Sequence, residues 1–207
     1  IIPMPEIDIP WLTGQPPTPS REPKHWLFIV DEANWQTVEE FNIWDSKANL
    51  DTLNKKIKQG DEAIFYVTGR NSSPKSMIAK NFVASFEITS KWVDKTGTPR
   101  PWPRNSMKDK TNPHFSKSHS ITLKPLANGR VPLDALEKTS VYKKELSRIN
   151  REKSSKKEKE RKISGIKGRL TQQTAMIAGN NATPLPKADY DLIVNQMKDN
   201  TPTISKI

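Results

Sequence analysis

The sequence predicts one domain of mixed strands and helices that carries two extensions of unusual composition. The chain has 207 residues, a length typical of one domain with additions rather than of two full domains. Short apolar runs rich in β-branched and aromatic residues alternate with segments of helical spacing. Only 33% of the residues are hydrophobic, so part of the chain must lie outside the packed core.

The composition narrows the class of partner. Lys and Arg number 34 against 23 Asp and Glu, and a net charge of +11 suits a phosphate-bearing partner, with an anionic membrane surface as the weaker option. The chain has no cysteine, which excludes disulfides and thiolate metal sites. Its three histidines, His25, His114 and His119, are too scattered for a metal cluster, and no cofactor is expected.

Targeting signals are missing from the sequence given. No apolar run approaches the roughly 20 residues that a membrane-spanning helix needs. The first residues, "IIPMPEIDIPW", lack the basic region of a signal peptide. We therefore expect a soluble cytoplasmic protein with no membrane partner.

The first extension is rich in proline. Residues 1–23 hold seven of the 17 prolines, a density that disfavours helix and favours an extended arm over residues 1–24. The arm is either a disordered tail or a segment docked through Ile7, Ile9 and Trp11. A short tail, 199–207, is expected at the other end.

The domain between these ends, residues 25–198, begins with a strand and a helix. The apolar run "HWLFIVDE" (25–32) predicts a buried strand. Helical spacing follows in 34–42, with Asn34 as the expected N-cap and an apolar face of Trp35, Val38 and Phe41.

The middle of the chain predicts a second helix and more strands. Residues 49–57 repeat the helical spacing with Leu50, Leu53 and Ile57. "KQGDEAIFYV" (58–67) predicts a Gly-Asp turn that leads into a strand, and 77–93 has the composition of a longer strand region.

The last elements follow a loop. Residues 94–117, rich in Pro, Gly, Asn and Lys, predict that loop, and 119–126 alternates like a half-buried strand. Pro132 is expected to open a short helix. The segment 186–197 predicts a closing helix, whose apolar face consists of Tyr190, Ile193, Val194 and Met197.

The second extension interrupts the domain and is strongly basic. Segment 141–169 has twelve Lys and Arg against four Glu, and so carries +8 of the total +11. This concentration predicts a helical arm that contacts nucleic-acid phosphates. The alternative is a solvated helix held by pairs such as Lys156/Glu160. The predicted phosphate-binding residues are Lys143, Lys144, Arg148, Arg151, Lys153, Lys156, Lys157, Arg161, Lys162, Lys167 and Arg169.

Four segments resemble a known family. They are "HWLFIVDEANWQTVEEFNIW", "LNKKIKQGDEAIFYV", "IAKNFVASFEIT" and "LPKADYDLIVNQM". Together they are similar to the EVE domain family of the PUA-like superfamily, in its archaeal and bacterial single-domain form, which is related to YTH domains. The resemblance implies an α+β fold, a curved and partly closed β-barrel with helices around it. It also implies an aromatic pocket for a flipped, modified base, like the one with which YTH domains read N6-methyladenine in RNA.

The resemblance assigns roles to individual residues. It places the cage tryptophan on Trp44 and a small polar position on Ser46 or Asp45, where many members have a glycine directly after the tryptophan. Asn34 matches a residue that contacts the base edge. The second cage aromatic is either Trp92 or Trp102, of which we favour Trp102.

The residues themselves leave the role of Trp44 open between core and pocket wall. Trp26 and Trp35 lie in apolar patterns and predict core positions, whereas turn-forming residues flank Trp44. Asp45, Ser46, Lys47 and Asn49 predict an exposed turn. A pocket wall would have few core contacts, and Trp44→Ala would then leave the melting temperature nearly unchanged.

Three classes of function are compared. The first is a nucleic-acid-binding module, with RNA favoured over DNA. The second is an enzyme using Asp31, Glu32 and Asp45, but no nucleophile–base pair or metal spacing accompanies them, so no catalytic residue is expected. The third is a structural ribonucleoprotein component, such as a ribosome-associated protein that binds rRNA through its arms.

Overall fold

The computed structural model describes residues 21–103, 119–171 and 182–199. The Pro-rich arm, apart from residues 21–24, lies outside these ranges, and so do residues 104–118 of the predicted loop and most of the C-terminal tail. The anchoring role expected of Ile7, Ile9 and Trp11 therefore stays a prediction.

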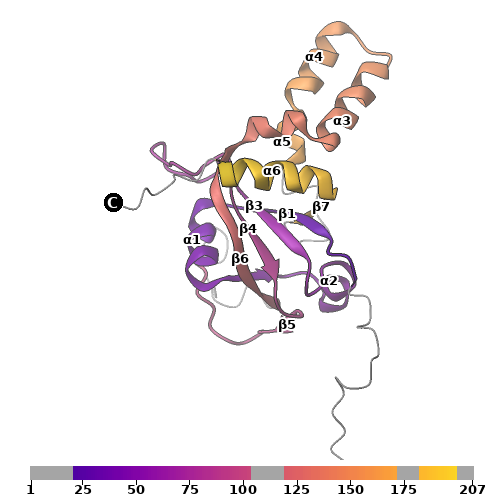
Figure 1. Ribbon diagram of the computed structural model, residues 1–207. Coiled ribbons are helices and arrows are strands. Elements are labelled where there is room, and N and C mark those ends of the chain that lie inside the picture. Colours follow the sequence, from indigo (N-terminus) through magenta and orange to yellow (C-terminus); the bar gives the residue numbers. More distant parts are fainter. Residues whose placement is uncertain (1–20, 104–118, 172–181, 200–207) are drawn as a thin grey trace, which may run out of the picture.

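One mixed sheet forms the centre of the molecule (Figure 1). Its strand order is β2-β6-β4-β3-β1-β7, and β5 pairs with His119 and Ser120 of β6, on the opposite side of that strand from β2. Strands β1 and β3 are parallel, and the other pairs are antiparallel. The strands are β1 (His25–Val30), β2 (Ile43–Ser46), β3 (Glu62–Val67), β4 (Asn81–Ile88), β5 (Val93–Asp94), β6 (His119–Pro132) and β7 (Ala182–Leu185).

Helices pack on both faces of the sheet, and a group of helices projects beyond one of its ends (Figure 1). The helices are α1 (Glu32–Phe41), α2 (Leu50–Lys56), the 3-10 helix η2 (Leu133–Lys138), α3 (Ser140–Arg151), α4 (Lys156–Ser164), α5 (Ile166–Leu170) and α6 (Lys187–Asp199). This arrangement of a curved, partly closed sheet with surrounding helices confirms the predicted α+β architecture.

Strand β1 shows why the sheet is buried on both sides. All six of its residues are buried, and successive side chains of a strand point to opposite faces. Trp26, Phe28 and Val30 join a cluster with residues of α1, α2 and β2. Leu27 and Ile29 join a second cluster under α6 and η2. The continuous apolar run in the sequence therefore reflects two cores, one on each side of the sheet.

The predicted Gly-Asp turn is confirmed and anchors the start of the sheet. Gly60 has φ +87°, a left-handed conformation that side chains disfavour. Its neighbour Asp61 is fully buried and accepts hydrogen bonds from the Trp26 indole, the Arg21 guanidinium and the backbone N–H groups of Lys24 and Lys58. These four donors offset the cost of removing the carboxylate from water.

Helix α1 differs from the prediction at both ends. The N-cap is Asp31, whose Oδ1 accepts the backbone N–H of Asn34 at 2.8 Å, so Asn34 lies inside the first turn and does not cap it. Trp35 and Val38 are buried as predicted. Phe41 is 48% exposed, because the helix ends there in a left-handed Asn42 and turns the chain into β2.

The basic segment forms three helices fixed to the domain by a contact from α6. Asp189, on α6 and buried, accepts hydrogen bonds from the backbone N–H groups of Ser140 and Val141 and from the Ser140 hydroxyl at 2.7–3.1 Å. It therefore caps α3 from a distant part of the chain. Ile149 of α3 and Ile166 of α5 are fully buried. Helices α3 and α4 form a hairpin that stands out beyond the sheet (Figure 1).

Helix α6 itself lies close against β6. A Cβ atom added at Gly129 would lie 2.7 Å from the Met197 carbonyl oxygen. The missing side chain lets the two backbones approach, and Met197 is fully buried at this crossing.

Candidate nucleic-acid interface

Trp44 lies at the centre of an aromatic cluster. It belongs to β2, pairs with Ile121 of β6 and is 2% exposed. Its ring centroid lies 5.7 Å from Phe28, 5.5 Å from Phe65 and 5.8 Å from Trp102. The two indoles are nearly perpendicular, at 88°, an edge-to-face geometry that aromatic rings prefer.

This packing corrects two expectations about the surrounding stretch. Asp45 and Ser46 are buried residues of β2, not parts of an exposed turn, although Lys47 and Asn49 are exposed as predicted. The pairing of β2 with β6 carries these polar side chains into the interior. The expectation that Trp44 has few core contacts is also wrong, because its ring packs on Phe28 and Phe65.

Asp45 organises the polar edge of the cluster. Its side chain is fully buried and accepts Arg100 in bidentate geometry, with Nε to Oδ2 at 2.7 Å and Nη2 to Oδ1 at 2.9 Å. The Trp102 indole Nε1 also donates to Oδ2 at 2.7 Å, and Arg100 Nη2 donates to the Ser120 hydroxyl at 2.7 Å. Asp45 thus holds two side chains of the loop after β5 against β2.

Arg100 is a member of this site that the sequence did not indicate. Its partner Asp45 lies 55 residues away, and no local spacing connects them. The Asp45 carboxylate raises the pKa of Arg100, chiefly through the hydrogen bonds, while partial burial opposes this. The guanidinium is therefore held in its charged form, and each charge of the pair has its partner.

The remaining predicted pocket residues lie on three different segments: Ser46 in β2, Asn34 in α1 and Trp92 directly before β5. The Ser46 hydroxyl accepts the backbone N–H of Ala48 at 3.1 Å, and Ser46 is buried. Asn34 is half-buried in the first turn of α1. Trp92 is buried, and its Nε1 donates to the carbonyl oxygen of Ile57 at 3.2 Å. Of the two alternatives, Trp102 is the one with a recorded ring contact to Trp44.

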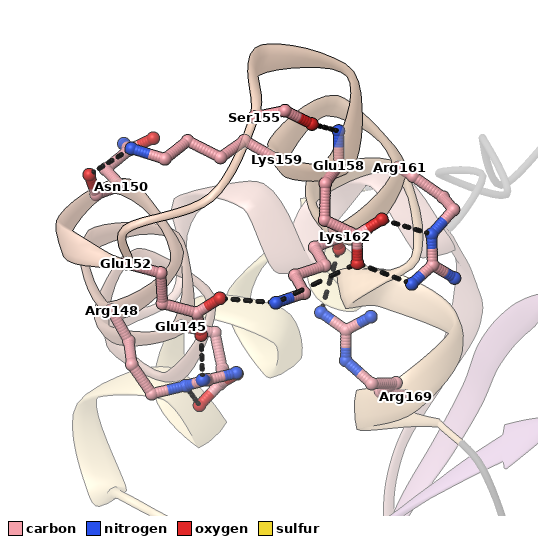
Figure 2. Close-up of polar contacts among 10 residues, drawn as sticks. All are labelled: Glu145, Arg148, Asn150, Glu152, Ser155, Glu158, Lys159, Arg161, Lys162 and Arg169. Atoms are coloured by element: carbon pink, nitrogen blue, oxygen red, sulfur yellow. Dashed lines mark hydrogen bonds and ion pairs between the residues drawn. The ribbon is translucent and has the colours of Figure 1, made fainter.

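Part of the basic segment is neutralised by its own glutamates (Figure 2). Arg148 pairs with Glu145 at 2.9 Å and Glu152 at 2.6 Å. Lys162 reaches the same Glu152 from α4, and so joins the two helices of the hairpin. Arg161 pairs with Glu158 at 2.8 Å. These contacts agree with the alternative of a helix held by ion pairs, although by different pairs from the expected Lys156/Glu160.

Three further cations of the segment hold the hairpin in place. Lys167 bridges Asp134 and Glu137 of η2, and these acceptors raise its pKa. Lys159 donates to the Asn150 carbonyl oxygen and Arg169 to that of Lys162, both at 2.8 Å. Together with the glutamate pairs, these bonds account for half of the twelve cations.

The other cations are exposed and have no recorded hydrogen bond or ion pair within the described part of the chain. They are Lys143, Lys144, Arg151, Lys153, Lys156 and Lys157. Exposed cations that do not serve the fold are the groups available to an anionic partner.

The described residues contain neither a candidate metal site nor a candidate membrane span. Among residues 21–103, 119–171 and 182–199, no group of three or more His, Asp or Glu is placed to hold a metal ion. Within the same ranges, no helix has the length and apolarity to cross a bilayer.

Solved structures give distant likenesses. A YTH domain of Toxoplasma CPSF4 in apo form matches with a TM-score of 0.45 and 14% identity over 89% of this chain and 93% of that one. The YTH domain of the Zygosaccharomyces rouxii MRB1 protein, in complex with N6-methyladenosine RNA, matches at 0.41 and 10% over 88% and 92%. A hypothetical protein from Leishmania major gives 0.43 and 13% over 86% and 96%.

Sequence comparison identifies the family. A UPF0310 protein of Pyrococcus abyssi is 32% identical over 66 residues, which are 32% of this chain and 46% of the relative. The match thus spans about half the length of that relative. The family model of the EVE domain matches residues 24–196, which include every strand of the described sheet. This chain therefore belongs to the EVE domain family.

Proposed function

We propose that the protein binds single-stranded nucleic acid, RNA in preference to DNA, and holds one flipped, modified base beside Trp44 and Trp102. Basic residues of segment 141–169 contact the phosphates. Membership of the EVE family supports the base site, and the exposed cations of the segment support the phosphate contacts. Single-stranded RNA presents unstacked bases, so little work is needed to flip one.

The contact between the two indoles is the observation that carries the proposal. Trp44 and Trp102 come from segments 58 positions apart and meet edge to face, with Asp45 tying Trp102 to β2. Each base–aromatic stack is worth ~1–3 kcal/mol. Two perpendicular rings can offer a base one stacking face and one apolar edge, which is the arrangement of a cage.

Entry of a base requires the two rings to separate. Both rings are nearly fully buried, at 2% and 5% exposure, and they contact each other, so a base can stack on one only if the other moves. The hydrogen bond from Trp102 to Asp45 resists this separation. Asp45 then acts as a positioning residue that sets how far Trp102 moves, while Asn34 or Ser46 supplies a contact to the base edge.

Selectivity for a modified base must come from more than methyl burial. One buried methyl group gains ~0.8 kcal/mol, which corresponds to about fourfold discrimination. An apolar cage adds to this by leaving an unmethylated amino group without a hydrogen-bond partner. The phosphate contacts supply affinity without choosing the base.

The proposal is tested by binding of short oligonucleotides to two matched variants. The probes are a single-stranded RNA with one adenine, the same RNA with N6-methyladenine, and the DNA equivalents. Trp102→Leu should weaken binding of the modified RNA by about ten- to a hundredfold, because a stacking face is lost. Trp92→Leu, at an equally buried tryptophan, should not, once the folded fraction is measured by circular dichroism.

Each other outcome has a distinct meaning. Loss of binding in Trp92→Leu alone would assign the second wall to Trp92. Equal binding by both variants and the unaltered protein would contradict the base site. The ribosomal alternative finds no support in the EVE family match or in the UPF0310 relative, because neither is named as ribosomal.

A further inference from the structure

The twelve cations of the basic segment fall into two groups with different positions. Six form contacts with acids or carbonyl groups: Lys159, Lys162, Lys167 and Arg169 join neighbouring helices, whereas Arg148 and Arg161 pair with glutamates three or four positions away. Figure 2 shows all of these except Lys167. Four of the other six are concentrated in seven residues where α3 ends and α4 begins. We call these four the hairpin tip: Arg151, Lys153, Lys156 and Lys157.

Two lysines of the tip lie at a helix end where positive charge is unfavourable. Lys156 and Lys157 occupy the first turn of α4, where the partial positive charge of the helix N-terminus disfavours cations. The cations of the last turn, Arg161 and Lys162, are on the favoured end and are paired with Glu158. The first turn also contains Glu158, but its carboxylate pairs with Arg161 and Lys162. Lys156 and Lys157 therefore have no ion pair within the described residues, which points to an anionic partner.

The tip is also far from the aromatic cluster. Asp45 pairs with Ser120 near the start of β6, whereas the hairpin leaves the sheet after Pro132 at the other end of that strand. At ~3.3 Å per residue, the strand separates these points by on the order of 40 Å. The hairpin then projects away from the sheet rather than folding back over it (Figure 1).

The hairpin holds this position through specific bonds. Asp189 caps α3, Lys167 ties α5 to η2, and Lys162 joins α4 to Glu152 of α3. The tip is therefore presented at a set distance from the aromatic cluster, not on a loose tether.

We propose that the hairpin tip is a second, remote phosphate-contact surface, and that the partner is a polynucleotide long enough to reach both it and the aromatic cluster. This rests on the proposed function of the aromatic cluster as the base site. The span along β6 alone, on the order of 40 Å, corresponds to about 12 nucleotides at ~3.4 Å per stacked nucleotide, and the hairpin beyond Pro132 adds to it. Shorter strands occupy one surface at a time.

The test combines strand length with a matched pair of variants. Lys156→Gln/Lys157→Gln removes two adjacent exposed lysines at the tip, and Lys55→Gln/Lys56→Gln removes two on α2. Each protein is titrated with RNAs of about 6 and about 20 nucleotides that share one modified adenine, over a range of salt concentrations. Circular dichroism confirms that helicity and melting are unchanged.

The tip variant should lose affinity for the long RNA alone. Two lost contacts reduce the log–log salt slope by about 1.4, or about 25-fold in affinity at 0.1 M relative to 1 M salt. The α2 variant should behave like the unaltered protein. An unchanged slope with the long RNA, or an equal loss with the short one, would overturn the proposal.

Two further outcomes distinguish the hairpin-tip proposal from the proposed base site and from membrane binding. If Trp102→Leu has no effect but the tip variant still loses long-RNA affinity, the base site fails and the tip remains a phosphate surface without a bridging role. Binding of the tip to phosphatidylserine vesicles, with no effect of its substitution on RNA, would assign it to a membrane surface and overturn the proposal.

Discussion

The aromatic cluster and the basic hairpin are held together by opposite kinds of contact. In the cluster, Asp45 binds Arg100 and Trp102, which lie 55 and 57 positions further along the chain. The ion pair with Arg100 is largely removed from water. In the hairpin, Arg148 and Arg161 pair with glutamates three or four positions away on exposed helix surfaces. The first arrangement depends on the whole fold and the second mostly on local helix geometry.

The difference has an energetic consequence. A buried charge that loses its partner costs ~3–5 kcal/mol, because the remaining charge cannot return to water. Exposed pairs are screened by salt, and their loss changes stability little. Substitutions in the cluster and the core should therefore lower the free energy of unfolding more than changes of charge in the hairpin.

The largest expected effect is at Trp44. Trp44→Ala should lower the free energy of unfolding by ~3–5 kcal/mol, because it removes a buried indole that packs on Phe28 and Phe65. Urea unfolding measures this, and Phe41→Ala, at an exposed aromatic of α1, is the control with little change expected. A Trp44 variant as stable as the parent would place Trp44 outside the core after all.

Asp189, which connects α6 to the start of the basic hairpin, should have an intermediate effect on stability. Asp189→Ala removes the distant cap of α3 and leaves the N–H groups of Ser140 and Val141 without their acceptor, while the local cap from Thr139 to the Tyr142 N–H remains. A lost cap costs ~0.5–2 kcal/mol, and hydrogen exchange should quicken in α3 and α4 more than in the sheet. Asp191→Ala, two positions along at a residue paired with exposed Lys187, should change neither quantity measurably. Uniform quickening would mean that the hairpin and the sheet unfold together.

The smallest expected effect is a pH dependence of the stability of the hairpin. Hydrogen bonds from Arg148, Lys162 and Arg161 hold the pKa values of Glu145, Glu152 and Glu158, respectively, below 4.5. A depressed pKa stabilises the folded state above the unfolded value, and this contribution disappears as the pH falls through the folded value.

Carbonyl NMR titration of these glutamates tests the prediction. Their midpoints should lie below 4.5 at low salt and move back toward 4.5 in 1 M salt, because the ion pairs are exposed and screened. Midpoints that do not respond to salt would contradict this exposure, which is 56% for the Arg148 side chain and 72% for that of Arg161.

The sequence predicted the parts of the fold that repeat a local pattern. The apolar run of β1, the Gly60–Asp61 turn and the buried face of α6 at Tyr190 and Ile193 all follow from spacing and composition. Residue types also suffice to locate the basic helices, since charge density is a local property.

The polar centre of the candidate site was not predictable in the same way. Asp45 carries a charge and follows a tryptophan, a pattern typical of a surface turn, yet strand pairing with Ser120 buries it. Its partner Arg100 lies in a loop whose path depends on the folded sheet. Likewise, nothing in the spacing of Lys156 and Lys162 shows that the second is paired with Glu152 and the first is not.

The cap that Asp189 places on α3 also sets an order of events during synthesis. The carboxylate lies 49 positions after Ser140, so the basic hairpin leaves the ribosome well before its anchor. Chains emerge at about 5–20 residues per second, which leaves a nascent hairpin without its final orientation for several seconds. A chain that stops before α6 would retain all twelve cations of the basic segment but lack the Asp189 bonds that help to orient the hairpin.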